Sequence, residues 1–229
     1  MKRYLMAALA LALVVMWGCL SDDSSDPDVK ITSTTLSPFT PRAYKAGDTF
    51  ESDVIATIDV PVIGSVRYDG TLVTDITDPG APVNGVTCLL ATNTLDATTT
   101  NPLVVGLPEE NYHSVIQVWF FEDASGLSVV KIDTDGTVDD FGTGVLDVPY
   151  PIGGTAAWVG ADGNTYTLDG AYTVEVDSYT FDCFKVNRNT SEATKYLTSD
   201  LGALVMAYGS SVITSGSLDL AILSYTLTP

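Results

Sequence analysis

The chain has 229 residues, with 10 basic and 29 acidic side chains and a formal net charge of −19 at pH 7. This acidity excludes the basic surface that nucleic-acid binding requires, and it opposes docking on anionic lipid headgroups. Hydrophobic residues make up 45% of the chain, and a chain of this length can bury one sizeable core.

The amino terminus has the parts of a secretory signal. Lys2 and Arg3 form a short positive leader, and an uninterrupted apolar run follows from Leu5 to Met16. The run is shorter than the ~20 apolar residues that a membrane-spanning helix needs. A positive start followed by a short apolar centre predicts a signal peptide over residues 1–18.

The apolar run is followed by Gly18-Cys19. This pair resembles the lipobox of bacterial lipoproteins, although Met16 and Trp17 depart from the usual Leu and small residue. The resemblance implies that Cys19 carries the lipid, including palmitate, and that acyl chains anchor the mature protein to a membrane of the bacterial cell envelope. Leu20 is not the Asp of inner-membrane retention, which favours the outer membrane of a Gram-negative host. An ordinary signal peptide cleaved elsewhere is the alternative.

Residues 19–43 combine low hydrophobicity with many Ser, Thr, Asp and Pro residues. Such a composition cannot bury enough apolar surface to offset the entropy of ordering. We therefore expect a lipidated, disordered acidic tether over residues 19–43, followed by a single β domain over residues 44–229.

From Tyr44 onward the pattern is a short apolar–polar alternation. Val54, Ala56 and Ile58 share one face of a predicted strand, because successive strand side chains point to opposite sides. The segment Thr194–Met206 contains Gly202 and is interpreted as strand, turn and strand rather than as a helix. Two-residue hairpin turns, which favour Asp or Asn before Gly, are predicted at Asp69-Gly70, Asn84-Gly85, Asp135-Gly136, Asp162-Gly163 and Asp169-Gly170.

Four features occur twice in the same order, which suggests an internal duplication with repeats 44–148 and 150–229. Each repeat is expected to be a meander whose apolar face covers the other. The predicted fold is all-β: an antiparallel curved sheet, a flattened half-barrel or a sandwich built from two duplicated meanders. The matched pairs are Tyr44–Phe50 with Tyr150–Ala156, Asp69-Gly70 with Asp169-Gly170, Val86–Leu90 with Phe181–Val186, and Trp119–Leu127 with Tyr196–Leu204.

The second repeat carries a wider resemblance. Phe181-Asp182-Cys183, Lys185-Val186, Tyr196-Leu197 and Gly202-Ala203-Leu204-Val205 resemble the "GTF-x-C-x-KV … YLAPGVGLVK" pattern of uncharacterised bacterial envelope lipoproteins. That group is similar in turn to the curved-sheet lipoprotein-carrier fold, which cradles acyl chains. The resemblance implies an open curved sheet and brings no catalytic residues with it.

The chain has a single histidine, His113, and none of the motifs of nucleotide-binding loops, zinc hydrolases or serine hydrolases. Carboxylate pairs suffice for glycoside hydrolysis, but among 29 acidic residues no pair stands out. We expect no enzyme activity, with a carboxylate-based glycan enzyme as the weakest alternative.

Two further groups of residues are candidate sites. Asp133, Asp135, Asp139 and Asp140 provide the oxygen donors that Ca²⁺ prefers, although an Asp-Gly hairpin on a solvated loop is the favoured explanation of this group. No other cofactor is expected. Cys88 and Cys183 occupy corresponding places in the two repeats, so they are either a disulfide linking the half-sheets or two separate buried thiols.

Aromatic residues are the candidate ligand-lining group: Trp119, Phe121, Trp158, Tyr172 and Tyr196, with Phe120 and Tyr166 as further members. Aromatic strands also serve as simple core. The expected function is that of a lipid-anchored envelope lipoprotein that binds a hydrophobic ligand, a peptide or a partner protein on a concave sheet face. The alternative is a structural or surface-interaction lipoprotein without a pocket, in which Asp-rich turns bind calcium.

Overall fold

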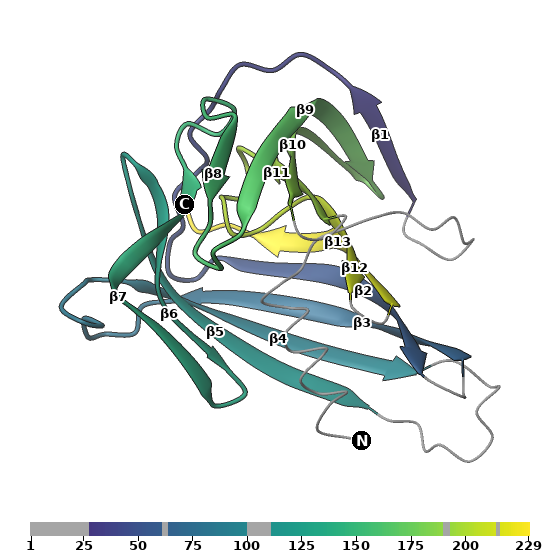
Figure 1. Ribbon diagram of the computed structural model, residues 1–229, viewed down its shortest axis with the longest axis horizontal. Helices are drawn as coiled ribbons and strands as arrows, with labels where there is room; N and C mark the ends of the chain where they lie inside the picture. The colour runs from purple at the N-terminus through teal and green to yellow at the C-terminus, as the bar shows by residue number, and fades with distance from the viewer. Residues whose placement is uncertain (1–27, 61–63, 100–110, 190–192, 214–215) are drawn as a thin grey trace.

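The computed structural model describes residues 28–60, 64–99, 111–189, 193–213 and 216–229. Within these residues the chain forms a 13-stranded antiparallel sheet and no helix (Figure 1). The strands are β1 (Val29–Ser33), β2 (Thr49–Val60), β3 (Gly64–Thr77), β4 (Leu89–Thr99), β5 (Tyr112–Asp123), β6 (Gly126–Thr134), β7 (Thr137–Pro149), β8 (Ala157–Val159), β9 (Thr165–Val176), β10 (Tyr179–Arg188), β11 (Ala193–Thr198), β12 (Tyr208–Ile213) and β13 (Gly216–Thr226).

The sheet consists of two meanders joined edge to edge. Strands β2 to β7 pair in chain order, strands β9 to β13 do the same, and β13 pairs with β2 to connect the two groups. The sheet ends at β1, which pairs with β9, and at β7. The all-β, antiparallel curved-sheet prediction is confirmed. The first meander ends at Pro149, close to the predicted repeat boundary, but the duplication itself stays a prediction.

Figure 1 shows the long strands β2 to β5 on one side and the strands β9 to β11 turned over them. The small strand β8, which pairs with β9, lies against the end of β7. There the indole nitrogen of Trp158 in β8 donates a 2.7 Å hydrogen bond to the carbonyl of Asp147 in β7. This contact fastens one end of the curved sheet to the second meander without extending the strand pairing.

Alternation explains how the strands divide their side chains between faces. In β5, Ile116, Val118 and Phe120 are buried, while Gln117 and Trp119 are only partly buried. In β2, Val54, Ala56 and Ile58 are at most 2% exposed, as the sequence pattern predicts.

The buried residues form two hydrophobic clusters. A large one includes Phe120, Leu127, Leu197, Leu201 and Ile222, and a smaller one includes Val54, Ile58, Val66, Leu95 and Leu218.

Of the five dipeptides predicted as hairpin turns, three lie in turns and two lie inside strands. Asn84-Gly85, Asp135-Gly136 and Asp162-Gly163 do lie in turns between strands. Asp69-Gly70 and Asp169-Gly170 were predicted as turns but lie inside β3 and β9. At Gly70 the reason is close strand approach, because a Cβ there would lie 2.2 Å from the carbonyl oxygen of Asp96 in β4. Asp169 lies where the register between β9 and β10 shifts.

The segment 194–206 contains no helix, but it departs from the predicted strand–turn–strand. β11 ends at Thr198, and the return strand β12 begins only at Tyr208. The intervening residues form an irregular segment, which bears directly on the site described below.

The predicted tether is wrong for residues 28–43. Val29–Ser33 form β1 against β9, and the ring of Phe39 stacks on that of Phe184 at a centroid distance of 5.5 Å. The composition of this segment suggested disorder, yet edge-strand pairing and one aromatic contact hold it on the domain. The predicted signal peptide, Cys19 and residues 19–27 lie outside the described residues.

Candidate functional site

A cavity of about 430 Å³ lies between the two meanders. Its volume falls within the range of small-molecule sites, roughly 300–1,000 Å³. Most of its lining is apolar and comes from members of both hydrophobic clusters. The apolar lining residues are Phe50, Leu72, Ile116, Val118, Val129, Ile132, Phe141, Ala161, Tyr166, Leu204, Val205, Met206 and Leu220, and the polar ones are Ser52, Thr74, Asn93, Asp139, Asp147, Asp162, Arg188 and Lys195.

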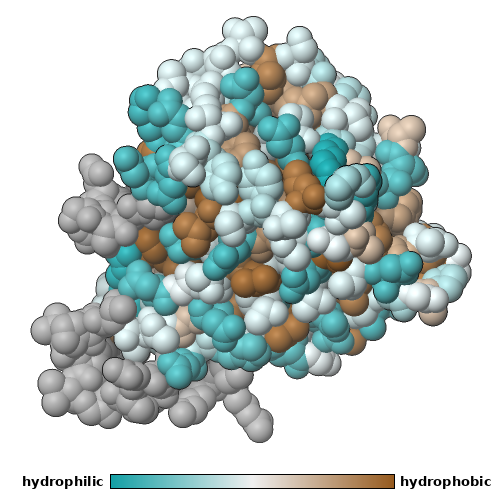
Figure 2. Space-filling view, turned by 180° about the vertical axis from the view of Figure 1, so that it is seen from behind, coloured by the Kyte–Doolittle hydropathy of each residue, from teal (hydrophilic) through white to brown (hydrophobic). Residues whose placement is uncertain are grey.

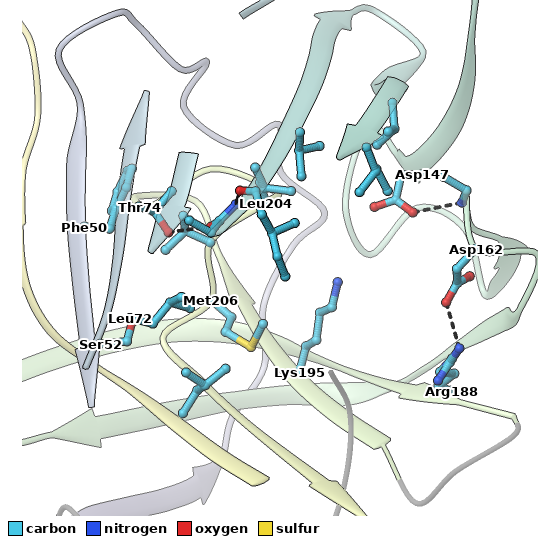
Figure 3. Close-up of a pocket in the computed structure, with 18 of the residues that line it drawn as sticks. Phe50, Ser52, Leu72, Thr74, Asp147, Asp162, Arg188, Lys195, Leu204 and Met206 are labelled. Atoms are coloured by element: carbon cyan, nitrogen blue, oxygen red, sulfur yellow. Dashed lines mark hydrogen bonds and ion pairs between the residues drawn. The ribbon is translucent and has the colours of Figure 1, made fainter. Parts of the chain in front are cut away.

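The cavity has two chemically different sides. In Figure 3, Phe50 and Leu72 lie on one side with Ser52 and Thr74, and Asp147, Asp162 and Arg188 lie on the other. The first side comes from β2 and β3, and the second comes from the end of β7, the β8–β9 turn and the end of β10. A molecule that spans the cavity therefore contacts an apolar side and a charged side at once.

Polar groups on the apolar side are satisfied within the protein. The hydroxyl of Thr74 donates to the side-chain oxygen of Asn93 at 2.7 Å, and the amide of Asn93 donates to the carbonyl of Ile116 at 3.2 Å. Because buried polar groups are costly unless hydrogen-bonded, this pairing lets Thr74 and Asn93 line an otherwise apolar surface.

Asp162 is the centre of a hydrogen-bonded group on the charged side. Its carboxylate accepts hydrogen bonds from the hydroxyl of Tyr166 at 2.6 Å and from the backbone of Asn164 at 2.9 Å, and it lies 3.0 Å from the guanidinium of Arg188. Burial alone raises the pKa of Asp162, but these hydrogen bonds and the charge of Arg188 outweigh it and lower the pKa below its ordinary value. Burial and the bond to Asp162 raise the pKa of Tyr166.

Lys195 in β11 lines the cavity beside this group. The residue is only 8% exposed, and Figure 3 shows its ammonium pointing into the cavity. The nitrogen lies 5.7 Å from the centre of the Tyr166 ring. Burial lowers the pKa of Lys195 to about 8, although Asp147 and Asp162 act in the opposite direction. The site therefore holds a cation in surroundings that solvate it poorly.

Asp147 in β7 connects the parts of the charged side through two hydrogen bonds. One oxygen of its carboxylate accepts a 2.9 Å hydrogen bond from the backbone N–H of Ala161, and its own carbonyl accepts the bond from Trp158. These two contacts position the β8–β9 turn, and with it Asp162, at the end of β7.

The irregular segment before β12 forms another wall of the cavity through Leu204, Val205 and Met206. The backbone N–H groups of Leu204 and Val205 donate to the hydroxyl oxygen of Tyr44 at 2.9 and 2.8 Å. Gly202 has a φ of +84° and packs on the Tyr44 ring, where a Cβ would lie 2.4 Å from a ring carbon. One buried tyrosine thus holds a wall that has no regular strand pairing of its own.

The five predicted lining residues do not line the cavity. Trp119 and Phe121 alternate with Val118 and Phe120 and so face the opposite side of β5, where the ammonium of Lys131 lies 4.2 Å from the Trp119 ring centre. Trp158 stacks on Tyr166 at 5.8 Å. The rings of Tyr172 and Tyr196 pack edge to face at 5.9 Å. Of the further aromatic candidates, Phe120 is fully buried core and Tyr166 lines the cavity.

The four candidate calcium ligands are not brought together. Asp133 accepts a bond from the backbone of Gly136, Asp135 from Ser114 and the backbone of Val115, and Asp140 from Asn84 and the backbone of Gly142. Asp139 instead lines the cavity. In the described part of the chain, no group of three or more His, Cys, Asp or Glu side chains is arranged to hold a metal ion.

The remaining candidates lie outside the cavity. Cys88 and Cys183 are separate buried thiols rather than a disulfide. Cys183 belongs to the large hydrophobic cluster, and burial raises its pKa. The side chain of His113 is 61% exposed and lies 2.7 Å from Asp96. The cavity lining, all of it in described residues, contains no histidine or cysteine.

Sequence reasoning missed Lys195, Arg188 and the wall formed by residues 204–206. A signal for Lys195 was present, because Ala193, Lys195 and Leu197 share one face of β11 and all three are buried. A lysine in phase with buried apolar residues is an unusual placement. The wall carried no such signal, since it depends on a contact with Tyr44, far away in the sequence.

No protein-family model, curated protein or solved structure matches this chain. Within the described residues, we find no helix with the length and apolar character needed to cross a membrane.

Proposed function

We propose that this chain is a non-catalytic, lipid-anchored lipoprotein of the cell envelope that binds a small hydrophobic or amphiphilic molecule between its two meanders. The cavity of about 430 Å³ between the meanders carries this proposal, because a concave, mostly apolar pocket with a few polar groups is typical of small-molecule sites. The lipobox-like Gly18-Cys19 supports the envelope anchoring.

The distribution of apolar residues on the surface favours the cavity, rather than an external patch, as the binding site. Figure 2 shows one face of the molecule, on which apolar residues are scattered among polar ones. Protein-interaction sites on monomers are more often contiguous apolar areas of several hundred Å². On this face, the surface-interaction alternative therefore has less support than ligand binding in the cavity between the meanders.

Binding is tested with N-phenyl-1-naphthylamine, a neutral probe that fluoresces in apolar surroundings, on the full chain and two variants. Leu72 lines the cavity from β3, and its neighbour Val73 points to the opposite face of the same strand. We expect Leu72→Trp to fill the cavity and weaken probe binding by about tenfold or more. We expect Val73→Trp to bind like the unchanged chain.

The paired variants separate the cavity from other apolar segments. Both carry the same amino terminus, so any probe bound by its apolar run contributes equally to both. Equal probe affinity in Leu72→Trp and Val73→Trp would contradict binding between the meanders, as would a lack of probe binding by the unchanged chain.

A further inference from the structure

The charged side of the cavity is balanced in charge. It holds the carboxylates of Asp147 and Asp162 and the cationic groups of Arg188 and Lys195. Arg188 lies 3.0 Å from Asp162, and Asp147 and Asp162 both favour the charged form of Lys195. Asp139, the remaining charged residue of the lining, is exposed, so water and salt screen its charge. A charged ligand of either sign would therefore meet no net opposite charge in the buried part of this side.

This balance favours an uncharged ligand. An ion loses much more hydration free energy than an uncharged polar group when it leaves water, and it needs a partner of opposite charge to recover that loss. The acidic and basic side chains of this side already lie close to one another. The net charge of −19 on the whole chain further opposes the approach of an anion.

One polar atom on this side is available for a hydrogen bond with a ligand. The carboxylate of Asp147 accepts the backbone N–H of Ala161 with one oxygen, at 2.9 Å. Figure 3 shows the other oxygen turned toward the cavity, and within the described residues no donor forms a hydrogen bond with it. An ionised carboxylate can only accept hydrogen bonds. This oxygen therefore favours a ligand that carries a donor, such as a hydroxyl group.

The opposite side of the cavity suits an alkyl chain. Phe50, Leu72, Val118 and Leu220 line it from β2, β3, β5 and β13. At about 430 Å³ the cavity lies near the small end of the range for ligand pockets, so it suits one chain rather than several.

We propose that the ligand is an uncharged single-chain amphiphile with a hydroxyl headgroup, which donates a hydrogen bond to Asp147 while the alkyl chain lies against Phe50, Leu72 and Leu220. This inference rests on the proposed function and adds the chemical class of the ligand. A hydrogen bond to an ionised acceptor is stronger than one between two neutral groups. The hydroxyl therefore determines the preference, and the chain provides affinity that ligands of equal length share.

Four ligands of matched length test the headgroup at pH 7: decanol, 1-methoxynonane, decanoate and decyltrimethylammonium. Each displaces N-phenyl-1-naphthylamine from the full chain. We expect decanol to bind about tenfold more tightly than either ion, because an ion leaves water without meeting a net opposite charge. We expect 1-methoxynonane to bind about fivefold more weakly than decanol, because its ether oxygen accepts hydrogen bonds but cannot donate one.

The same ranking in salt separates the cavity from the overall charge of the chain. In about 0.5 M sodium chloride, exposed charges act over only a few ångströms, whereas buried groups are screened much less. The preference for decanol over decanoate should therefore persist. A preference that disappears in salt would contradict discrimination by the groups in the cavity.

Asp147→Asn assigns the preference to one residue. The amide oxygen can still accept the N–H of Ala161, while an NH₂ group replaces the second oxygen and one negative charge is lost. We expect this variant to bind decanol and 1-methoxynonane equally well, and to bind decanoate about tenfold more tightly than the unchanged chain does.

Asp182→Asn is the matched control. Asp182 is an exposed residue of β10 outside the cavity lining, and its substitution removes the same charge from the chain. This variant should keep the ranking of the unchanged chain. Thermal melting shows whether both variants fold, and the ranking on the unchanged chain tests the proposal without either of them.

The outcomes separate the two proposals. If decanoate or decyltrimethylammonium binds as tightly as decanol, or if Asp147→Asn keeps the preference for decanol over 1-methoxynonane, the headgroup inference is wrong while binding in the cavity stands. If neither the probe nor any of the four ligands binds the unchanged chain, the proposed function itself fails.

Discussion

The guanidinium of Arg42 donates two hydrogen bonds, of 2.6 and 3.1 Å, to the carboxylate of Asp48. Asp48 is fully buried and also accepts bonds from the backbone N–H groups of Lys45 and Thr228. Arg42 in turn donates to the carbonyl of Thr228 at 2.6 Å. This group joins the segment before β2 to the chain after β13, so it fastens the junction between the two meanders.

We expect Asp48→Asn to lower the free energy of unfolding by roughly 2–3 kcal/mol, because it weakens several hydrogen bonds to a buried charge at once. Urea denaturation of the full chain measures the change. Glu175→Gln is the control, since its ion pair with Lys30 at 2.9 Å is largely exposed and exposed pairs contribute about 0–1 kcal/mol. Equal losses in the two variants would contradict a special role for Asp48.

The same group predicts an acid dependence of stability. Burial raises the pKa of Asp48, but the bonds from Arg42, Lys45 and Thr228 outweigh it and lower the pKa below the ordinary value. A carboxyl whose folded pKa is depressed stabilises the fold fully above its unfolded pKa of about 3.9 and loses this contribution as the pH falls through the folded value. Urea midpoints below about pH 4 should therefore fall more steeply in the unchanged chain than in Asp48→Asn.

Tyr44 is expected to stabilise both the fold and the cavity wall formed by residues 204–206. Tyr44→Phe removes the oxygen that accepts the N–H groups of Leu204 and Val205 and leaves two amides without that partner in a cavity wall. A lost acceptor for a buried donor costs about 1–3 kcal/mol. We expect this loss in urea denaturation, together with faster amide hydrogen exchange in residues 202–206. Unchanged exchange there would contradict the role of Tyr44.

Much of the fold was predictable because strand alternation and turn chemistry are local. Val54, Ala56 and Ile58 alternate in the sequence and are buried together, and Asp135-Gly136 forms a turn with positive φ at both residues. Asp69-Gly70 failed because the same dipeptide also suits a place where two strands come unusually close. Dipeptide identity alone does not distinguish a turn from close packing.

The site was less predictable because it depends on which face of each strand is concave. The large side chains of the run Trp119-Phe120-Phe121 suggested a ligand-lining strand, yet of the three only Phe120 shares the face of Val118. The smaller side chains Ile116 and Val118 line the cavity instead. The alternation of inward-facing and outward-facing positions along β5 and its neighbours places Trp119 and Phe121 on the outer face, whereas the number of aromatic residues says nothing about the face.

The amino terminus yields a prediction that is independent of the cavity. We expect the full chain, expressed in a bacterium and labelled with radioactive palmitate, to carry the label, and we expect Cys19→Ser to abolish it. Cys88→Ser is the control, because Cys88 is a buried thiol whose pKa is raised by burial and a buried thiol is a poor nucleophile. Retention of label in Cys19→Ser would contradict lipidation at this residue.

The buried Lys195 should give the ligand-free protein an unusual dependence of stability on pH. Its pKa of about 8 in the folded chain lies below the ordinary value of about 10.4, so the unfolded chain binds the proton more tightly between these two values. Stability should therefore rise with pH across this window, whereas a lysine whose pKa is raised by a salt bridge makes stability fall as the pH rises.

Lys195→Met should be more stable than the unchanged chain at neutral pH, because it removes the cost of a buried ammonium, and should lose the rise above about pH 8. Urea midpoints of both chains between about pH 7 and pH 10 measure the difference. A Lys195→Met variant that is less stable than the unchanged chain at neutral pH would contradict this prediction, because the contacts of the ammonium would then outweigh the cost of its burial.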